Sequence, residues 1–141
     1  MSSQDVISLS IPNNAEYVGV VRLAVAGLAA RLNYSVDDVE NIKIAVSEAC
    51  SNAIQYAYED KGIITITCTV EPTELTIQIS DTGRGFRPTS PQTKDFDNPE
   101  HDNQGLGLGM TFINCLMDEA NVESTPGEGT TVTMRRAIAT A

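Results

Sequence analysis

The sequence predicts an α+β fold, a two-layer sandwich whose mixed, mostly antiparallel sheet carries its helices on one face. Segments with strand and helix periodicity follow in the order β-α-α-β-β-loop-α-β-β, so strands come in adjacent pairs. A doubly wound parallel sheet would need strands and helices to alternate throughout. The 141 residues include 41% hydrophobic and 20% charged residues, which predicts a single domain over residues 1–141 with one packed core.

The N-terminal half is predicted to hold one edge strand and two helices. Residues 6–11 alternate apolar and polar side chains and end at Pro12, which is typical of an edge strand. Residues 15–32 carry apolar side chains at helical spacings, and a second helix is expected over residues 36–58, with Ser35 as its N-cap. The inner stripe of this second helix is expected to contain Val36, Val39, Ile42, Val46, Ala49, Ala53 and Tyr56.

The C-terminal half is predicted to hold four strands, a long loop and a helix. Residues 63–70 and 75–80 are β-branched alternating runs that indicate a hairpin. Residues 86–104 contain three prolines and little periodicity, so we expect a mobile loop of a length that is usually functional or disordered. The remaining expected elements are a helix over 106–117 and strands over 120–124 and 130–135.

Composition excludes several classes of function. With 9 basic and 19 acidic residues, the net charge of −10 disfavours nucleic acid and fits either a basic protein partner or simple solubility. Cys50, Cys68 and Cys115 lie in apolar segments without CxxC spacing, so we expect buried, reduced thiols and a cytoplasmic location. The single histidine, His101, gives no support to a zinc site. No signal peptide is visible, and the apolar stretch 18–30 is too short to cross a bilayer.

Glu48 and Asn52 form the first of three segments that carry chemical information. Residues four apart on a helix lie one turn above each other on the same face. An asparagine oxygen is a suitable ligand for Mg²⁺, and a glutamate one turn away can deprotonate a hydroxyl group. Taken alone, such a pair is more often a solvated outer face. The adjoining ridge of small residues, however, leaves room for a ligand, and it consists of Ala45, Ala49 and Ala53.

Asp81 marks the second segment, because it follows the apolar run 75–79 at the exit of a predicted strand. A carboxylate there can accept a hydrogen bond from an exocyclic amine such as N6 of adenine. Gly83 and Gly85 would let the backbone approach the base closely. Taken alone, Asp-Thr-Gly is also good turn chemistry.

The third segment is a run of alternating glycines, Gly105, Gly107 and Gly109, separated by Leu106 and Leu108. It opens the predicted helix, where free N–H groups and the helix dipole bind phosphate. The run matches neither a Walker A loop nor the dinucleotide-binding fingerprint, and taken alone it is also typical of a hinge. Together, the three segments offer a base, a metal ligand, a base-reading acid and a phosphate cradle.

In order and spacing, these segments resemble the motifs of the GHKL ATPases, whose Bergerat fold is shared by histidine-kinase catalytic domains, gyrase, Hsp90 and MutL. Residues 48–52 resemble the N box, 81–85 the first glycine box and 105–109 the second. Within that superfamily the chain most resembles the bacterial anti-sigma-factor serine kinases of the RsbW and SpoIIAB type. The similarity extends over residues 5–136, and its matching stretches are 16–23, 43–53, 117–124 and 129–132.

The resemblance implies an ATP-dependent protein-serine kinase with named roles for matching residues. Glu48 would be the general base, and Asn52 would ligate Mg²⁺. Asp81 would read adenine N6, with Thr130 supporting the base through water. The glycines of residues 105–109 would hold the triphosphate, so that phosphoryl transfer depends on positioning and charge neutralisation.

The resemblance also implies partners. Such kinases sequester a sigma factor and phosphorylate its anti-anti-sigma antagonist, a STAS-type protein, on serine. They are typically homodimers, and their ATP lid would correspond to residues about 86–104. Arg22 matches a partner-contacting arginine of the sporulation branch, although an arginine snorkelling from the core edge is an equally good interpretation.

The chain departs from the family pattern at two places, and two other functions stay open. Tyr56 stands where several relatives carry histidine, and Asn103 and Gln104 stand where some carry a basic residue, leaving Arg84, Arg87 or Lys94 to neutralise phosphate. The first alternative is a nucleotide-dependent binding module without transfer. The second is a switch kinase of the same fold that acts on a scaffold and never binds a sigma factor.

Overall fold

The computed structural model describes residues 4–56, 62–81, 111–125 and 129–138. Residues 111–116 are helical. The expected loop over 86–104 and the first part of the helix expected over 106–117 lie outside the described residues. The labelled elements are β1 (Asp5–Pro12), the short 3₁₀ helix η1 (Ala15–Tyr17), α1 (Val18–Ala30), α2 (Val36–Tyr56), β2 (Ile63–Val70), β3 (Glu74–Asp81), β4 (Glu119–Thr125) and β5 (Gly129–Ala137).

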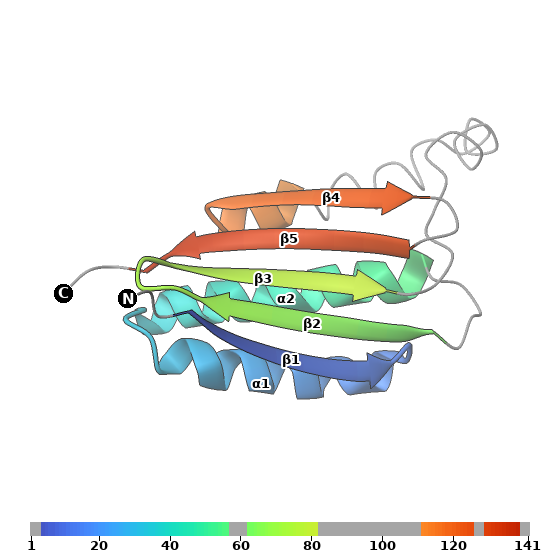
Figure 1. Ribbon diagram of the computed structural model, residues 1–141, viewed down its shortest axis with the longest axis horizontal. Helices are drawn as coiled ribbons and strands as arrows, with labels where there is room; N and C mark the ends of the chain where they lie inside the picture. Colours follow the sequence, from blue (N-terminus) through green and yellow to red (C-terminus); the bar gives the residue numbers. More distant parts are fainter. Residues whose placement is uncertain (1–3, 57–61, 82–110, 126–128, 139–141) are drawn as a thin grey trace.

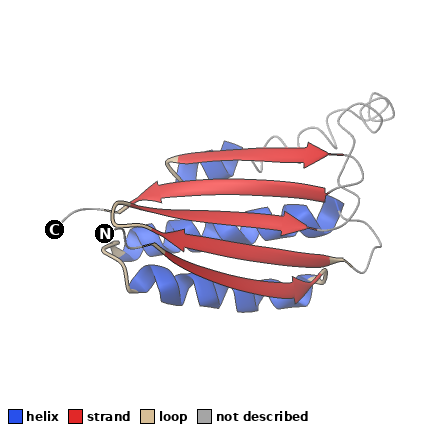
Figure 2. Cartoon of the chain, in the orientation of Figure 1, coloured by secondary structure: helices blue, strands red, loops and turns tan. Residues whose placement is uncertain are grey.

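The described strands form one sheet in the order β1-β2-β3-β5-β4, and each neighbouring pair is antiparallel. Figure 1 shows α1, α2 and the helical residues 111–116 on the same face of this sheet. Figure 2 shows the same division into a strand layer and a helix layer. The predicted two-layer α+β sandwich is therefore confirmed, as is the edge position of the first strand.

The core lies between the two layers and follows from alternation along the strands. Ile64, Ile66 and Cys68 of β2 are buried, whereas the threonines between them are only half-buried on the open face of the sheet. The same alternation buries Leu75, Ile77 and Ile79 of β3. Each fully buried aliphatic side chain contributes about 1.5–3 kcal/mol, so this pattern fixes which face of the sheet receives the helices. The helix layer supplies, among others, Val21, Val25, Ile42, Ala45, Val46, Ala49, Cys50 and Ile113.

Ser35 caps α2 as predicted. The Asp38 backbone N–H donates to Ser35 Oγ at 3.0 Å, and the Ser35 N–H donates to Asp38 Oδ2 at 3.3 Å. These reciprocal hydrogen bonds form a capping box and satisfy donors at the helix start. The expected inner stripe was wrong at Val36, whose side chain is 79% exposed. Val36 lies six residues before the fully buried Ile42. At about 100° per residue, this spacing places the Val36 side chain about 120° around the helix from Ile42.

Two of the three cysteines are buried as expected. Burial raises the pKa of Cys50 to about 12 and that of Cys68 to about 11. The expectation was wrong for Cys115, which is exposed. Ile113 and Met117 face the core, so Cys115 lies on the outer side of this helical segment. Among the described residues, no helix has the length and apolar character needed to cross a membrane.

Candidate nucleotide site

Glu48 and Asn52 lie on one flank of α2 and are half-buried. The opposite flank faces α1, because Arg22 Nη1 donates to Ser47 Oγ at 3.3 Å. Figure 1 shows α2 between α1 and the helical residues 111–116, so the flank with Glu48 and Asn52 faces the side of that second neighbour. The small side chains of the predicted ridge, Ala45, Ala49 and Ala53, lie beside this flank and are buried in the core.

The Asn52 amide contains a buried polar atom. Its Nδ2 is buried and has no hydrogen-bond partner within the part of the chain that the structure describes. Buried polar atoms are nearly always satisfied in folded proteins, and one left open is suited to receive a water molecule, an ion or a ligand. Because the two ends of an amide are exchanged by a 180° flip, the same position can present an oxygen to a cation.

Asp81 ends β3 as a carboxylate that is only 6% exposed. The strand before it is anchored by the fully buried Ile77 and the 1% exposed Ile79, which hold the backbone up to the strand's last residue. Thr130, on β5, is 9% exposed. The pairing of Ser80 with Thr131 is the last in the β3–β5 register and brings Asp81 and Thr130 onto adjacent strands at the same level.

The end of β3, the start of β5 and the C-terminal part of α2 lie at one end of the sheet (Figure 1). We call this the nucleotide end and define it by Asn52, Asp81, Gly129 and Thr130. Asn52 of the first predicted segment and Asp81 of the second, which are far apart in the sequence, thus lie at the same end of the sheet (Figure 1). The other predicted site residues lie outside the described residues, namely Gly83, Gly85, Gly105, Leu106, Gly107, Leu108 and Gly109, as do Arg84, Arg87, Lys94 and the Tyr56 side chain.

Gly129 is a site residue to which the sequence alone assigned no role. It has φ +101°, a conformation that L side chains rarely adopt, and it is buried against Asp81. The signal that could have found it is its place directly before the strand expected over residues 130–135, where a glycine permits a close approach of two strands.

The residues that are present fit the predicted role of Asn52 as a magnesium ligand. Among the described residues no group of three His, Cys, Asp or Glu side chains could hold a metal ion. Mg²⁺ does not need such a group, because it keeps several water ligands and is usually bound through one or two side chains together with substrate phosphates. A single open amide at Asn52 is consistent with that mode of binding.

Comparison with known proteins agrees with this architecture. Residues 11–136 match the family model described as the histidine kinase-like ATPase domain. The serine-protein kinase RsbW of Bacillus velezensis is 39% identical over 150 residues, which cover 96% of this chain and 87% of the relative. The serine-protein kinase RsbW of Bacillus cereus strain G9842 is 41% identical over 137 residues, covering 94% and 84%.

Solved structures show the same fold. The RsbU and RsbW domains of a Mycobacterium tuberculosis protein match with a TM-score of 0.69 at 17% identity, over 95% of this chain and 32% of that chain. The histidine kinase domain of an Erythrobacter litoralis blue-light activated kinase matches with a TM-score of 0.58 at 24% identity, over 91% and 62%.

The fold and the site together define an ATPase domain of the histidine kinase-like class, and such a domain uses a nucleotide. The sequence identity narrows the class further. The chain belongs to the RsbW-type serine-protein kinases. The resemblance to the anti-sigma-factor serine kinases, and the kinase activity that it implied, are therefore confirmed.

Proposed function

We propose that the protein transfers the γ-phosphoryl group of ATP to a serine of an anti-anti-sigma antagonist, and that it sequesters the cognate sigma factor when the antagonist is phosphorylated. The observation that carries this proposal is the common location of the open Asn52 amide and the buried Asp81 carboxylate at the nucleotide end. Membership of the RsbW-type kinases supplies the class of reaction.

In this proposal the adenine is recognised by Asp81 and Thr130. The carboxylate accepts a hydrogen bond from the N6 amine, and the threonine hydroxyl supports the base through water. Both side chains are less than one-tenth exposed, which strengthens such hydrogen bonds relative to those made in water. The backbone at Gly83 and Gly85 would lie beside the base, and residues 105–109 would bind the triphosphate under a lid at about 86–104.

Asn52 would hold Mg²⁺, which supplies charge neutralisation on the phosphate oxygens when it is bound. Glu48, one helical turn away on the same flank, would act as the general base. The serine Oγ–H proton passes to the Glu48 carboxylate while Oγ forms a bond to the γ-phosphorus. The bond from that phosphorus to the β–γ bridging oxygen breaks, and ADP leaves with the electron pair.

The proposal extends to the partners and to the assembly. A net charge of −10 suits partners with basic surfaces, such as proteins that themselves bind DNA. Arg22 is exposed on α1, which fits a contact with a partner. A homodimer and a cytoplasmic location complete the proposal.

A transfer assay with Glu48→Gln tests the catalytic part. Purified protein is incubated with labelled ATP and an antagonist captured on the wild-type kinase in the presence of ADP, so that the acceptor serine is unmodified. We expect transfer to fall by about 10²–10⁴-fold, with ADP affinity within about twofold of wild type, because only the base is lost. Glu40→Gln is the control, since Glu40 is exposed on the same helix and pairs with Lys43 at 3.1 Å. A full rate in Glu48→Gln would remove Glu48 from the role of base.

A pull-down in the presence of ADP or ATP tests the partners. We expect a sigma factor among the captured proteins, and its release when unphosphorylated antagonist is added. An antagonist that is phosphorylated without any sigma factor being captured would instead favour a switch kinase that acts on a scaffold. Capture of both partners without any phosphate transfer would favour a binding module.

A further inference from the structure

Gly129 begins β5 in direct contact with the residue proposed to read the base. A Cβ atom built at this position would collide with the Asp81 backbone carbonyl oxygen and would lie 3.4 Å from Asp81 Oδ1. The residue also has φ +101°, so an L side chain there is strained even without the collision. Two independent features of the backbone therefore require glycine at the point where β5 meets the end of β3.

The residues next to this contact along β3 and β5 are held in place by strand pairing and burial. A shift caused by an added side chain at position 129 would therefore fall on Asp81. Ser80 pairs with Thr131, and their hydroxyl oxygens are 3.0 Å apart. Ile79, one residue further along β3, is 1% exposed and packed in the core. Since these neighbours cannot move without disturbing buried contacts, a Cβ at position 129 displaces the last residue of β3.

We infer that Gly129 is a positioning residue for base recognition, and that it sets the selectivity of the site for a 6-amino purine over a 6-oxo purine. This inference rests on the proposed function, in which Asp81 accepts a hydrogen bond from adenine N6. Guanine presents an oxygen at the same ring position, and a carboxylate repels that oxygen. The discrimination holds only while the Asp81 carboxylate keeps its place, and glycine at position 129 is what keeps it there.

The size of the effect follows from the tolerance of such sites. A functional group must lie within roughly 0.5 Å of its productive position, and a misplacement of about 1 Å can reduce function by about 100-fold. A Cβ that collides with backbone forces a shift on this scale, because the obstacle is not the flexible end of a side chain.

Gly129→Ala tests the inference, with ADP and GDP affinities measured by calorimetry and with kcat and KM measured for ATP and GTP. We expect ADP affinity to fall by about 10–100-fold and GDP affinity to change by less than about threefold, so that the preference for adenine is largely lost. Gly27→Ala is the matched control. That glycine lies in α1 with no neighbouring atom within 4 Å, so an added Cβ meets open space and should leave both affinities unchanged.

The Asp81→Asn background separates this inference from the proposed function. If Gly129 acts through Asp81, Gly129→Ala should have little further effect on ADP affinity once the carboxylate is gone. If Asp81→Asn itself leaves ADP affinity unchanged, the proposed site is wrong and the inference is lost with it. If Asp81→Asn weakens ADP binding but Gly129→Ala leaves the ADP-to-GDP ratio intact, only the inference is overturned.

A second variant guards against loss of folding. Gly129→Asn adds the same Cβ with less backbone strain, because asparagine tolerates positive φ better than alanine does. A folded Gly129→Asn with reduced discrimination between ADP and GDP supports the inference. If neither variant folds, Gly129 is a determinant of the fold rather than of base recognition, and the inference is wrong.

Discussion

The two ends of the sheet differ in how far their buried and half-buried polar groups are paired with one another. At the nucleotide end, the Asn52 amide has a buried nitrogen without a hydrogen bond in the described part of the chain, beside a carboxylate that is 6% exposed. The other end, which we call the closed end, is defined by Tyr34, Asp38, Leu116, Asp118 and Arg136. There, polar groups from distant parts of the chain are joined to one another.

The closed end is organised around Arg136. Its guanidinium group donates to the Leu116 carbonyl and forms an ion pair with Asp38 in the first turn of α2. Its carbonyl accepts a hydrogen bond of 2.8 Å from the Tyr34 hydroxyl. Asp118 Oδ2 accepts from the Ala137 N–H at 2.7 Å. These contacts join the start of α2 and the end of the helical residues 111–116 to β5.

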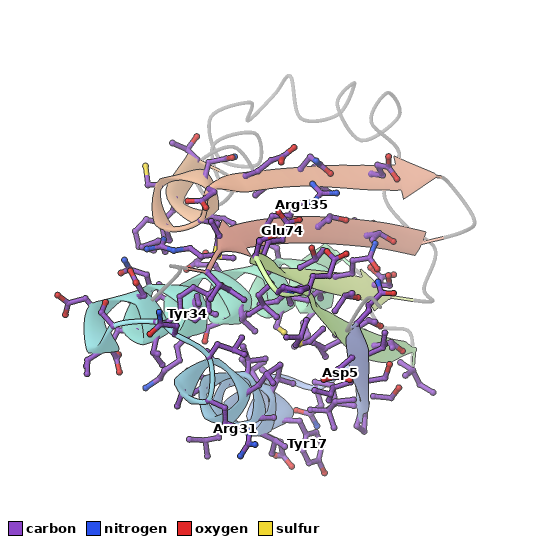
Figure 3. All side chains as sticks on the ribbon, turned by 60° about the vertical axis from the view of Figure 1, so that its left-hand side comes forward. Asp5, Tyr17, Arg31, Tyr34, Glu74 and Arg135 are labelled. Carbon is purple, nitrogen blue, oxygen red and sulfur yellow. The ribbon has the colours of Figure 1, made fainter. Side chains whose placement is uncertain are left out.

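A second set of ion pairs lies next to the closed end, on the open face of the sheet. Arg135 Nε lies 3.5 Å from Glu74 Oε2, and Arg135 Nη1 lies 3.3 Å from Glu119 Oε1. Figure 3 shows Glu74 and Arg135 close together. Contacts that stabilise the fold and the residues of the proposed site therefore lie at opposite ends of the sheet. Satisfied polar networks rigidify a fold, whereas an open polar group at a site gives up some stability so that a ligand can be bound.

Asn52→Ala, at the nucleotide end, is the substitution with the largest expected effect. We expect phosphoryl transfer to fall by on the order of 100-fold, because the proposed magnesium ligand is lost. The free energy of unfolding should change by less than about 1 kcal/mol, since Nδ2 makes no hydrogen bond to any residue that the structure describes. A magnesium titration of activity and urea denaturation measure the two effects.

Asn41→Ala is the matched control for Asn52→Ala. Asn41 is half-buried about three turns earlier on the same flank of α2, so the control removes the same side chain away from the site. A loss of stability in Asn52→Ala as large as that expected at the closed end would contradict the comparison.

Arg136→Met should have the opposite profile. The substitution removes the ion pair with Asp38 and the hydrogen bond to the Leu116 carbonyl, so we expect a loss of about 2 kcal/mol in unfolding free energy. The KM for ATP should stay within about twofold, because Arg136 does not reach the nucleotide end. Arg31→Met, at the exposed end of α1, is the control for the loss of a positive charge. A raised KM with unchanged stability would assign Arg136 to the site.

Tyr34→Phe removes a single hydrogen bond from the same network. Burial raises the pKa of Tyr34, so its hydroxyl stays protonated and acts as a donor throughout the accessible pH range. We expect a loss of about 1 kcal/mol in unfolding free energy. Tyr17→Phe is the control, because Tyr17 lies at the surface (Figure 3). Equal effects of the two substitutions would show that the hydrogen bond to Arg136 contributes nothing.

The smallest expected effect is the loss of unfolding free energy at acid pH when the Asp38 carboxyl group of the closed end becomes protonated. The hydrogen bond from the Ser35 backbone N–H, helped by the Ser35 hydroxyl and the Arg136 guanidinium, lowers the pKa of Asp38. A lowered pKa stabilises the fold above the ordinary value of the carboxyl group and loses that effect as the pH falls through the folded value.

The measurement compares wild type with Asp38→Asn in urea denaturation. The difference in unfolding free energy between them should narrow from about pH 5 to about pH 2. Asp37→Asn removes the same charge from the same helical turn and reports the contribution of the helix dipole alone. A difference that stays constant over this range would show that Asp38 does not stabilise the closed end through its charge.

Local sequence patterns were sufficient for most of the elements. The alternation in residues 63–70 and 75–80, the Ser35 capping position and the spacing of Glu48 and Asn52 all predicted what the structure contains, because each depends on neighbours a few residues away. The errors at Val36 and Cys115 arose because each of these apolar side chains lies off the buried face of its helix, where no neighbouring layer covers it.

The sequence by itself determined the class of fold, the family and the chemical character of the three segments, since periodicity, capping and motif spacing are local properties. Only the tertiary structure decided that β5 lies between β3 and β4, that Gly129 meets Asp81, and that Arg136 joins Asp38. The physical reason is that strand order and register depend on burying the whole sheet face at once. No short stretch of the chain encodes those pairings.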